Sequence, residues 1–573
     1  MPAVVYSPCP SFPKLAVLFL AVLFCAAASK AADDEARLEL VKKLYSEQEW
    51  DEAAKLAEGP ADQSPALDYY RGMALARLER WQEARDAFSP GARKAPGDAR
   101  FPTERAGAEY KLGDFAGAKK DLRRALCLAP GDSYIPEFLG TIYLLEGNLE
   151  AALKYWNRLG KPKLTALALS PAPKTSQILL DRALRVAPPQ TLERSALLKT
   201  DALLQNLGVF PHRKAELVPD GDEGGYKATL QWTERSGWGQ TPVDGAMVLL
   251  RGLPYETVFP SWYGIAARAI NFDSLLRWDA EKRRFAGNLD FPLFAQPAKR
   301  FRFFFDARNE NWNLGRSFSA GAAPSDLNMK RFAGGAELNF VPSGSWDFRA
   351  GVEAVSREFR NVPAGLPGPA APFFTDSRSV DAWLGAHRWL TRIPERRFTL
   401  EGTGEVRLGR SYSSGLGAFA SLAGGMTARW LPKARGDDFA LESKVRAGVT
   451  SGDVPFDFLS ELGVERDNDL WMRGHDATID GRKGGAPLGR RYFLWNSEFD
   501  KNVYDGGFLR VQLGPFFDSG AVADRTGLFG SQKWLFDAGI EAKVRVLGSV
   551  SLVVSYGRDL RNGKGLLFAT SGR

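Results

Sequence analysis

The sequence predicts a multidomain chain in which a helical solenoid and a small β-α-α-β-β module precede a transmembrane antiparallel β-barrel. Three observations predict this order: a repeat of 34 residues in the first part, mixed strand and helix patterns in the second, and a hydrophobic period of two up to the C-terminus. We expect a leader at 1–32, helical repeats at 33–160, the module at 161–236 and the barrel at 237–573.

The first 32 residues have the pattern of an export signal. Lys14 precedes an apolar run at 15–24, and small residues follow through Ala32. This run is shorter than the ~20 residues of a membrane-spanning helix, so we expect a signal peptide. Of the three cysteines, Cys9 and Cys25 lie in the leader, and Cys127 alone cannot form an internal disulfide.

Composition argues against several classes of protein. The 76 basic and 68 acidic residues are interspersed, so we expect no nucleic-acid partner. The three histidines (His212, His387 and His475) are scattered, and neither a nucleophile elbow nor a phosphate-binding glycine loop is present. We therefore expect no enzyme, no metal site and no cofactor. The 37 Phe and 15 Trp suit a β-rich part whose outer surface does not face water.

Small and large apolar residues recur every 34 residues between Glu35 and Arg158. The recurring small residues are Ala84, Ala118 and Ala152, each three places after a large one (Trp81, Phe115 and Leu149), together with Gly72, Ala106 and Gly140. This spacing resembles tetratricopeptide repeats, which form curved scaffolds for protein partners. An unspecialised helical spacer is the alternative.

Residues 161–236 alternate between strand and helix patterns. The expected elements are a strand at 163–169, helices at 175–186 and 192–207, and strands at 213–218 and 226–233. This order, placed before a β-rich half, resembles a POTRA domain. The resemblance implies that clients or partners bind by adding a strand to an open sheet edge. A plain spacer is the alternative.

From Gly237 onward, apolar and charged residues alternate. Phe301, Phe303 and Phe305 share one face, opposite Arg302 and Asp306, and residues 346–354, 398–408 and 536–546 follow the same pattern. Strands of roughly ten residues match the span of tilted strands in membrane barrels. A soluble sandwich shows the same alternation, but the export signal and the scarcity of helix favour a membrane barrel with a charged, wet lumen.

Two short segments near the C-terminus carry a more specific resemblance. Arg473-Gly474-His475 lies in a long connection between about Gly452 and Gly489. Five strands are expected after it, at Arg491–Phe499, Phe508–Asp518, Leu535–Val546, Val550–Tyr556 and Gly565–Thr570. The second of these contains Phe516-x-Asp518-x-Gly520. The Arg-Gly pair and this strand motif, with five closing strands, resemble the Omp85 superfamily of outer-membrane barrels (bacterial surface antigen D15 type). The resemblance covers about 161–573.

The Omp85 resemblance implies about 16 strands and a loop that folds into the lumen. It also implies that Arg473 pairs with Asp518 on the barrel wall. The alternation agrees, since an outward Phe517 places Phe516 and Asp518 inside, and an inward Glu498 on the preceding strand is a candidate second acceptor. A planar guanidinium fits a carboxylate through two parallel hydrogen bonds.

The sequence departs from the superfamily pattern at three places. His475 stands where the superfamily has Phe or Tyr, and Met472 where it often has Val. We expect the imidazole to stack or to form a hydrogen bond in place of the aromatic ring. The chain also ends at Arg573 rather than on a terminal aromatic residue.

The Omp85 resemblance implies an outer-membrane protein with periplasmic N-terminal domains that assembles or translocates other proteins. Clients or partners would meet the repeats and the POTRA-like module, and the barrel would contact outer-membrane lipid. The alternative is a passive export conduit for polysaccharide or another polymer, with the repeats as a scaffold. A structural barrel without transport is a third hypothesis.

Overall fold

The computed structural model describes residues 33–60, 62–221, 225–235, 237, 245–246, 251–321, 323–413, 416–433, 438–507, 509–546 and 550–572. The expected signal peptide lies outside these residues. The chain divides into two compact units, Met1–Leu145 with Lys154–Leu159, and Glu146–Leu153 with Gly160–Arg573. None of the helices described is both long enough and apolar enough to cross a membrane.

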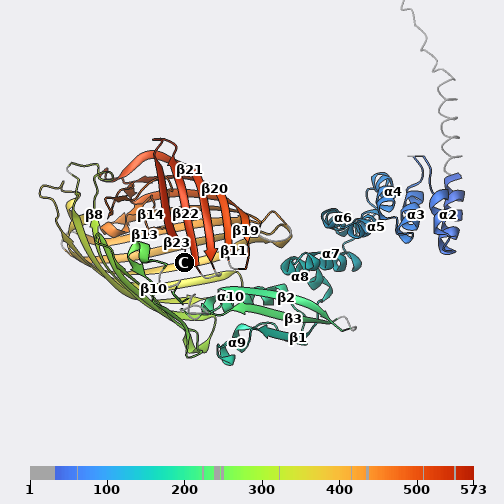
Figure 1. The fold of residues 1–573 in the computed structure, drawn as a ribbon, viewed down its shortest axis with the longest axis horizontal. Helices are drawn as coiled ribbons and strands as arrows, with labels where there is room; N and C mark the ends of the chain where they lie inside the picture. The colour runs from blue at the N-terminus through green and yellow to red at the C-terminus, as the bar shows by residue number, and fades with distance from the viewer. Residues whose placement is uncertain are drawn as a thin grey trace, which may run out of the picture. The chain divides into compact units, whose positions relative to one another are not determined.

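The first unit is helical and its helices pack as successive neighbours (Figure 1). After a helical stretch at 33–46, its helices are α2 (Trp50–Leu56), α3 (Pro65–Arg77), α4 (Trp81–Lys94), α5 (Arg100–Lys111), α6 (Phe115–Leu128), α7 (Tyr134–Leu145) and the C-terminal part of α8 (Leu149–Trp156). The repeating small residues lie at close approaches between helices. A Cβ atom on Gly72 would lie 2.4 Å from the ring of Phe88, and one on Gly140 would lie 2.3 Å from the ring of Trp156. The period of 34 therefore marks where paired helices meet.

The second unit begins with the predicted β-α-α-β-β order. Its elements are β1 (Leu164–Ser170), α9 (Gln177–Ala183), α10 (Arg194–Leu207), β2 (His212–Asp220) and β3 (Gly225–Thr233). The sheet order is β1-β3-β2, with β1 parallel and β2 antiparallel to β3. Leu180, Leu203, Phe210 and Trp232 form part of its core. Gly208 follows α10 with a φ of 72°, the left-handed conformation that commonly ends a helix.

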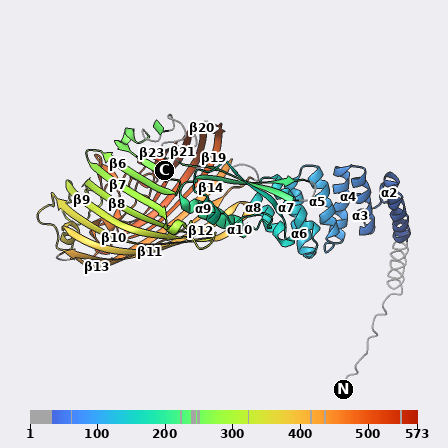
Figure 2. The same cartoon turned by 90° about the horizontal axis from the view of Figure 1, so that it is seen from below.

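The rest of the second unit is a large, strongly curved and mainly antiparallel sheet (Figures 1 and 2). Its strands outside the long connection are β4 (Thr257–Val258), β5 (Ser261–Ile265), β6 (Ile270–Trp278), β7 (Lys282–Pro292), β8 (Lys299–Trp312), β9 (Leu327–Phe340), β10 (Trp346–Arg360), β11 (Ser377–Ile393), β12 (Phe398–Ser413), β13 (Leu416–Trp430), β14 (Phe439–Gly452), β19 (Arg491–Asp505), β20 (Leu509–Ala523), β21 (Gly530–Val546), β22 (Val550–Asp559) and β23 (Gly565–Gly572).

The connection 453–490 between β14 and β19 carries only two-residue strands. They are β15 (Ser460–Glu461), β16 (Thr478–Ile479), β17 (Arg482–Lys483) and β18 (Leu488–Gly489). The described sheet order names 18 strands, and β16 and β17 are the two of these that lie in the connection. Short 3-10 helices occupy some turns, among them Leu253–Tyr255, Leu293–Ala295, Ala371–Phe374, Pro394–Arg396 and Phe456–Phe458.

Several strands are longer than the sequence pattern predicted. The strand expected at 491–499 continues to Asp505 as β19, through residues that are mostly polar. The strand expected to end at Asp518 continues to Ala523 as β20. Backbone pairing extends past the segment in which apolar and charged residues alternate, and the alternation alone therefore underestimated the strand length.

The two faces of the sheet differ in polarity as the alternation predicted. Along β21, Phe536 and Ile540 are 39% and 65% exposed, whereas Asp537 and Glu541 are 0% and 6% exposed. The connection 453–490 contacts the face with the buried charges, which we call the inner face. The opposite, outer face is apolar and exposed. This is the reverse of a water-soluble sheet protein, in which exposed faces are polar.

The two ends of the sheet are also different. At one end, the α/β module packs on the strand turns, where Asn206 Nδ2 donates to Pro297 O (2.7 Å) and Asn271 Nδ2 donates to Leu207 O (3.0 Å). At the other end, the connections after β8, β10 and β20 join the start of the long connection in an apolar cluster. Its largest members are Trp312, Phe318, Phe373, Phe374, Phe456 and Phe529. We call this cluster the apolar cap.

Candidate functional site

The connection 453–490 is held on the inner face by buried ion pairs with strands that lie early and late in the chain. Asp467 bonds to Arg277 of β6 and Arg284 of β7, each at 2.6 Å. Only six residues further along, Arg473 contacts strands β19, β20 and β21. The connection thus links the early and late strands of the sheet through charged side chains.

Arg473 and Asp518 form the pair that the Omp85 resemblance implied. The guanidinium donates to both carboxylate oxygens of Asp518, from Nε (3.0 Å) and Nη2 (2.8 Å), and the Arg473 backbone N–H donates to the same group (2.9 Å). Nη1 of Arg473 lies 3.1 Å from Glu498, as predicted, and 3.1 Å from Glu541, which sequence reasoning missed. Both Arg473 and Asp518 are buried, so these hydrogen bonds take the place of the bonds that the charged groups would form with water.

The other residues of the strand motif surround this pair. The Arg473 guanidinium carbon lies 3.8 Å from the ring centre of Phe516, so the ring packs under the charge. Asn496 of β19 donates to Asp518 Oδ1 at 2.8 Å. Gly520 lies where a Cβ atom would be 2.9 Å from the backbone oxygen of Phe493, so a side chain there would crowd β19. Each of the three guanidinium nitrogens of Arg473 therefore faces a carboxylate, and the flat face of the guanidinium packs on the Phe516 ring.

Three aspartates lie side by side across neighbouring strands. Asp518 of β20 is the register partner of Asp537 of β21, which in turn is the partner of Asp559 at the end of β22. We call these residues the aspartate row. Like charges directly opposite one another on a sheet are destabilising unless a cation compensates them. The row therefore needs a positively charged partner.

Consecutive residues of the connection cover the aspartate row one strand at a time. Arg473 binds Asp518, the Gly474 N–H donates to Asp537 (2.6 Å), and His475 lies between Asp537 and Asp559. The approach is close at Gly474, where a Cβ atom would be 2.6 Å from Asp559 N and 2.7 Å from Asp537 Oδ1. This contact explains why the residue between the two cationic side chains is glycine.

His475 forms the hydrogen bond expected of it and faces a second carboxylate as well. Its Nδ1 is 3.1 Å from Asp537 and its Nε2 is 3.6 Å from Asp559. These three side chains are also close enough to share a metal ion. The two ring nitrogens, however, face different carboxylates, which suits an imidazolium with two N–H donors. Burial lowers the pKa of His475, but the bond to Asp537 and the charges of Asp537 and Asp559 outweigh it and raise the pKa above its ordinary value.

Two further carboxylates of the connection, Asp457 and Glu465, bind strands β7, β9 and β10. Asp457 bonds to Arg331 of β9 (2.8 Å) and Arg357 of β10 (2.5 Å). Burial raises the pKa of Asp457, but these two charges outweigh it and hold the pKa well below its usual range. Glu465 bonds to Lys282 of β7 at 3.2 Å. The partners in these contacts are at least 100 residues apart in sequence, and no local pattern pointed to them.

Glu461 differs from these paired acids. It is buried in β15, and its Oε1 has no hydrogen-bond partner among the described residues. Burial raises the pKa of Glu461 to about 8, although the charge of Lys483 opposes the shift. Glu461 is thus a neutral acid near pH 7 inside the connection.

We expect the connection to be held less firmly as pH rises. Since the folded pKa of His475 is raised, its stabilising effect is complete below its unfolded pKa of roughly 6.5 and is lost as pH rises through the folded value. Glu461 acts in the same direction, and its contribution is lost as pH approaches 8. Limited proteolysis of the connection, normalised to an unstructured peptide, should be faster at about pH 9 than at about pH 6. A His475→Phe/Glu461→Gln variant should lose most of this difference, and an unchanged profile would contradict the assignment.

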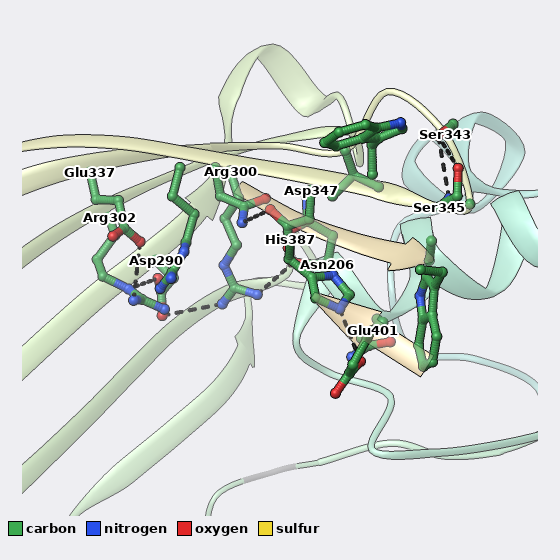
Figure 3. Close-up of a pocket in the computed structure, with 18 residues that line it drawn as sticks. Asn206, Asp290, Arg300, Arg302, Glu337, Ser343, Ser345, Asp347, His387 and Glu401 are labelled. Carbon is green, nitrogen blue, oxygen red and sulfur yellow. Dashed lines mark hydrogen bonds and ion pairs between the residues drawn. The ribbon is translucent and has the colours of Figure 1, made fainter. Parts of the chain in front are cut away.

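A polar cavity of about 410 Å³ lies between α10 and the inner face, at the end of the sheet that carries the module (Figure 3). Arg300 spans it, bonding to Asn206 O (2.6 Å) and to Asp290 (3.2 Å). Arg302 bonds to Asp290 (2.7 Å) and Glu337 (3.3 Å). The cavity wall thus carries both signs of charge beside the docked helix α10.

No protein-family model and no curated protein matches the chain. Among solved structures, BamA from Haemophilus ducreyi lacking POTRA domains 1–3 is 11% identical over 72% of this chain and 84% of that chain, with a TM-score of 0.41. CdiB from Acinetobacter baumannii is 13% identical over 72% of this chain and 74% of that chain, with a TM-score of 0.42. MamA 41-end from Desulfovibrio magneticus RS-1 is 15% identical over 22% of this chain and 73% of that chain, with a TM-score of 0.21.

BamA and CdiB are β-barrels of the Omp85 superfamily, the superfamily that the motifs of this chain resemble.

Proposed function

We propose that residues 237–573 form a closed Omp85-type barrel in a bacterial outer membrane, and that the chain assembles or translocates other proteins there. The observation that carries this proposal is the buried Arg473–Asp518 pair on a connection that also binds β6 and β7. A loop locked inside a barrel by an arginine and a wall aspartate is what the superfamily resemblance implied.

Closure of the barrel is supported by the length of chain between the two anchor points. Six residues of backbone span at most roughly 21 Å, so the strands bound by Asp467 and Arg473 lie on either side of a narrow space. The strand order supports it too, because β23 and β4 are neighbours in that order. An apolar outer face and a charged inner face are the polarity of a membrane barrel.

We propose that clients approach from the periplasmic side. The repeats at 33–160 and the POTRA-like module at 161–236 would lie there and bind clients or partner proteins. Strand β2 lies at an edge of the module's sheet and several of its residues are exposed, so it offers backbone groups for strand addition. The cavity beside α10 opens at the same end and would receive polar segments of the client. This role needs no catalytic chemistry and no cofactor.

The alternative function, a passive export conduit, requires an open lumen. In this chain, ion pairs hold the connection 453–490 across the inner face, and the apolar cap gathers the connections at the far end. Both features favour a gated assembly role over a conduit that is permanently open.

Depletion of the protein tests the proposed function. Cell fractionation should place the chain in the outer membrane, and its loss should lower the amounts of other outer-membrane proteins at unchanged transcript levels. Loss of a surface polymer with outer-membrane proteins intact would favour the export conduit. Recovery in the soluble fraction would contradict the proposed barrel.

A further inference from the structure

A second cavity, of about 360 Å³, lies on the outer side of the sheet at the end that carries the module. Ile270 of β6 and Phe291 of β7 form its floor, and Ile178 and Leu179 of α9 form its opposite wall. Its volume is within the range of small-molecule sites. We call it the outer groove. It is separate from the charged cavity of Figure 3, which lies on the inner side.

The floor of the outer groove continues the apolar outer face. Asn271 pairs with Asp290 in the register of β6 and β7, so Ile270 and Phe291 occupy the next rung. Further rungs on the same face pair Phe272 with Leu289 and Leu276 with Phe285. Leu276, Phe285 and Leu289 are 45%, 49% and 38% exposed. The rung between them pairs Ser274 with Gly287, and the Ser274 hydroxyl donates to Pro260 O at 2.8 Å. An apolar chain lying along this face would therefore reach the groove without meeting a charged side chain.

The walls of the outer groove are joined at both ends. The Ser176 N–H donates to Ala267 O (2.7 Å), which ties the start of α9 to the turn between β5 and β6. Arg182 Nη1 donates to Phe294 O (3.0 Å) and Ala295 O (2.9 Å), which ties α9 to the turn between β7 and β8. These hydrogen bonds hold both ends of α9 against the strand turns, and they bound the groove at its two ends.

The groove combines exposed apolar side chains with a cation at its rim. Ile178 is 59% exposed, and Phe294 on the adjoining turn is 80% exposed. Arg268, which lines the groove, is exposed, and its guanidinium has no hydrogen bond or ion pair with any described residue. An apolar trough that ends at an unpaired arginine matches a molecule with a hydrocarbon chain and an anionic head.

We propose that the outer groove binds a phospholipid of the periplasmic leaflet, with part of an acyl chain between α9 and the Ile270–Phe291 rung and the phosphate at Arg268. The proposal rests on the proposed function, because it requires the outer face to meet lipid. The bound lipid would fasten the α/β module to the membrane surface and so fix the module where clients arrive.

The test uses the full chain reconstituted into vesicles of equal parts phosphatidylethanolamine and phosphatidylglycerol. After extraction in mild detergent, native mass spectrometry should find one retained phospholipid on the unchanged chain. Ile178→Glu places a charge in the groove and should lower its occupancy at least about tenfold. Arg268→Ala should lower it less, because the acyl chain contact remains. Arg283→Ala, an exposed arginine at the other end of β7, is the matched control and should retain the lipid.

The outcomes separate this inference from the proposed function. If the unchanged chain inserts into vesicles but Ile178→Glu retains as much phospholipid as the control, the groove is not a lipid site and the barrel stands. If the unchanged chain fails to insert, the barrel and the lipid site are both wrong. Equal retention by Arg268→Ala and Arg283→Ala would overturn the phosphate contact.

Discussion

Asp518→Ala is expected to release the connection 453–490 from β20. Asp518 accepts three hydrogen bonds from Arg473 and one from Asn496, all between 2.8 and 3.0 Å. Without it, the Nε and Nη2 donors of a buried arginine lose their acceptors. Removing one partner of a buried ion pair costs ~3–5 kcal/mol, and we expect about 3 kcal/mol because Nη1 keeps Glu498 and Glu541.

Trypsin digestion followed by mass spectrometry measures this release. Arg473 and Lys483 are 5% and 6% exposed, so the connection of the unchanged protein should resist cleavage at both. Asp518→Ala should be cleaved there, and Asp518→Asn should be intermediate because it keeps one acceptor oxygen. Asp505→Ala removes an exposed partner of Arg510 near the other end of the same hairpin and should behave as the unchanged protein. A resistant connection in Asp518→Ala, with client assembly intact, would refute the lock.

The alternation of β20 and its neighbours was sufficient to place one half of this site. Outward Phe517 fixed the inward direction of Phe516 and Asp518, and the same reasoning on β19 selected Glu498. Period-two patterning determines the face on which a side chain lies, and this part of the prediction therefore depended only on local sequence.

The aspartate row and Glu541 could not be predicted in this way. Asp537 and Glu541 were already on the polar face of their strand by alternation, but which residue of β20 each would face depends on the register. Register is set by turn geometry and by packing over the whole sheet, and a single sequence does not specify it. The partners of the connection on β6 to β10 lie still further away in sequence, so these contacts could be identified only from the folded structure.

The second strong prediction concerns Asp467, because Asp467→Ala should remove the carboxylate that two arginines share. Asp467 is the shared acceptor of Arg277 and Arg284, and the side chains of Asp467 and Arg277 are 2% and 4% exposed. Arg284 retains Asp306 at 2.8 Å, whereas Arg277 keeps only a neutral hydroxyl, that of Thr257, among its described partners. We expect a loss of ~3–5 kcal/mol in the stability of the folded barrel. Chemical denaturation in detergent micelles measures it.

Asp469→Ala is the matched control, since Asp469 lies two residues further along the same connection, is 87% exposed and pairs with Arg446 at 3.3 Å. It should cost less than about 1 kcal/mol.

Because the Asp467 and Asp518 anchors share no partner, their effects on unfolding should add within about 0.5 kcal/mol in the double variant. Release of the whole connection should instead be greater than additive, since either anchor alone retains part of it. Purely additive cleavage at Arg473 and Lys483 would show that the two ends of the connection open independently, and the proposed clamp across the lumen would then be wrong.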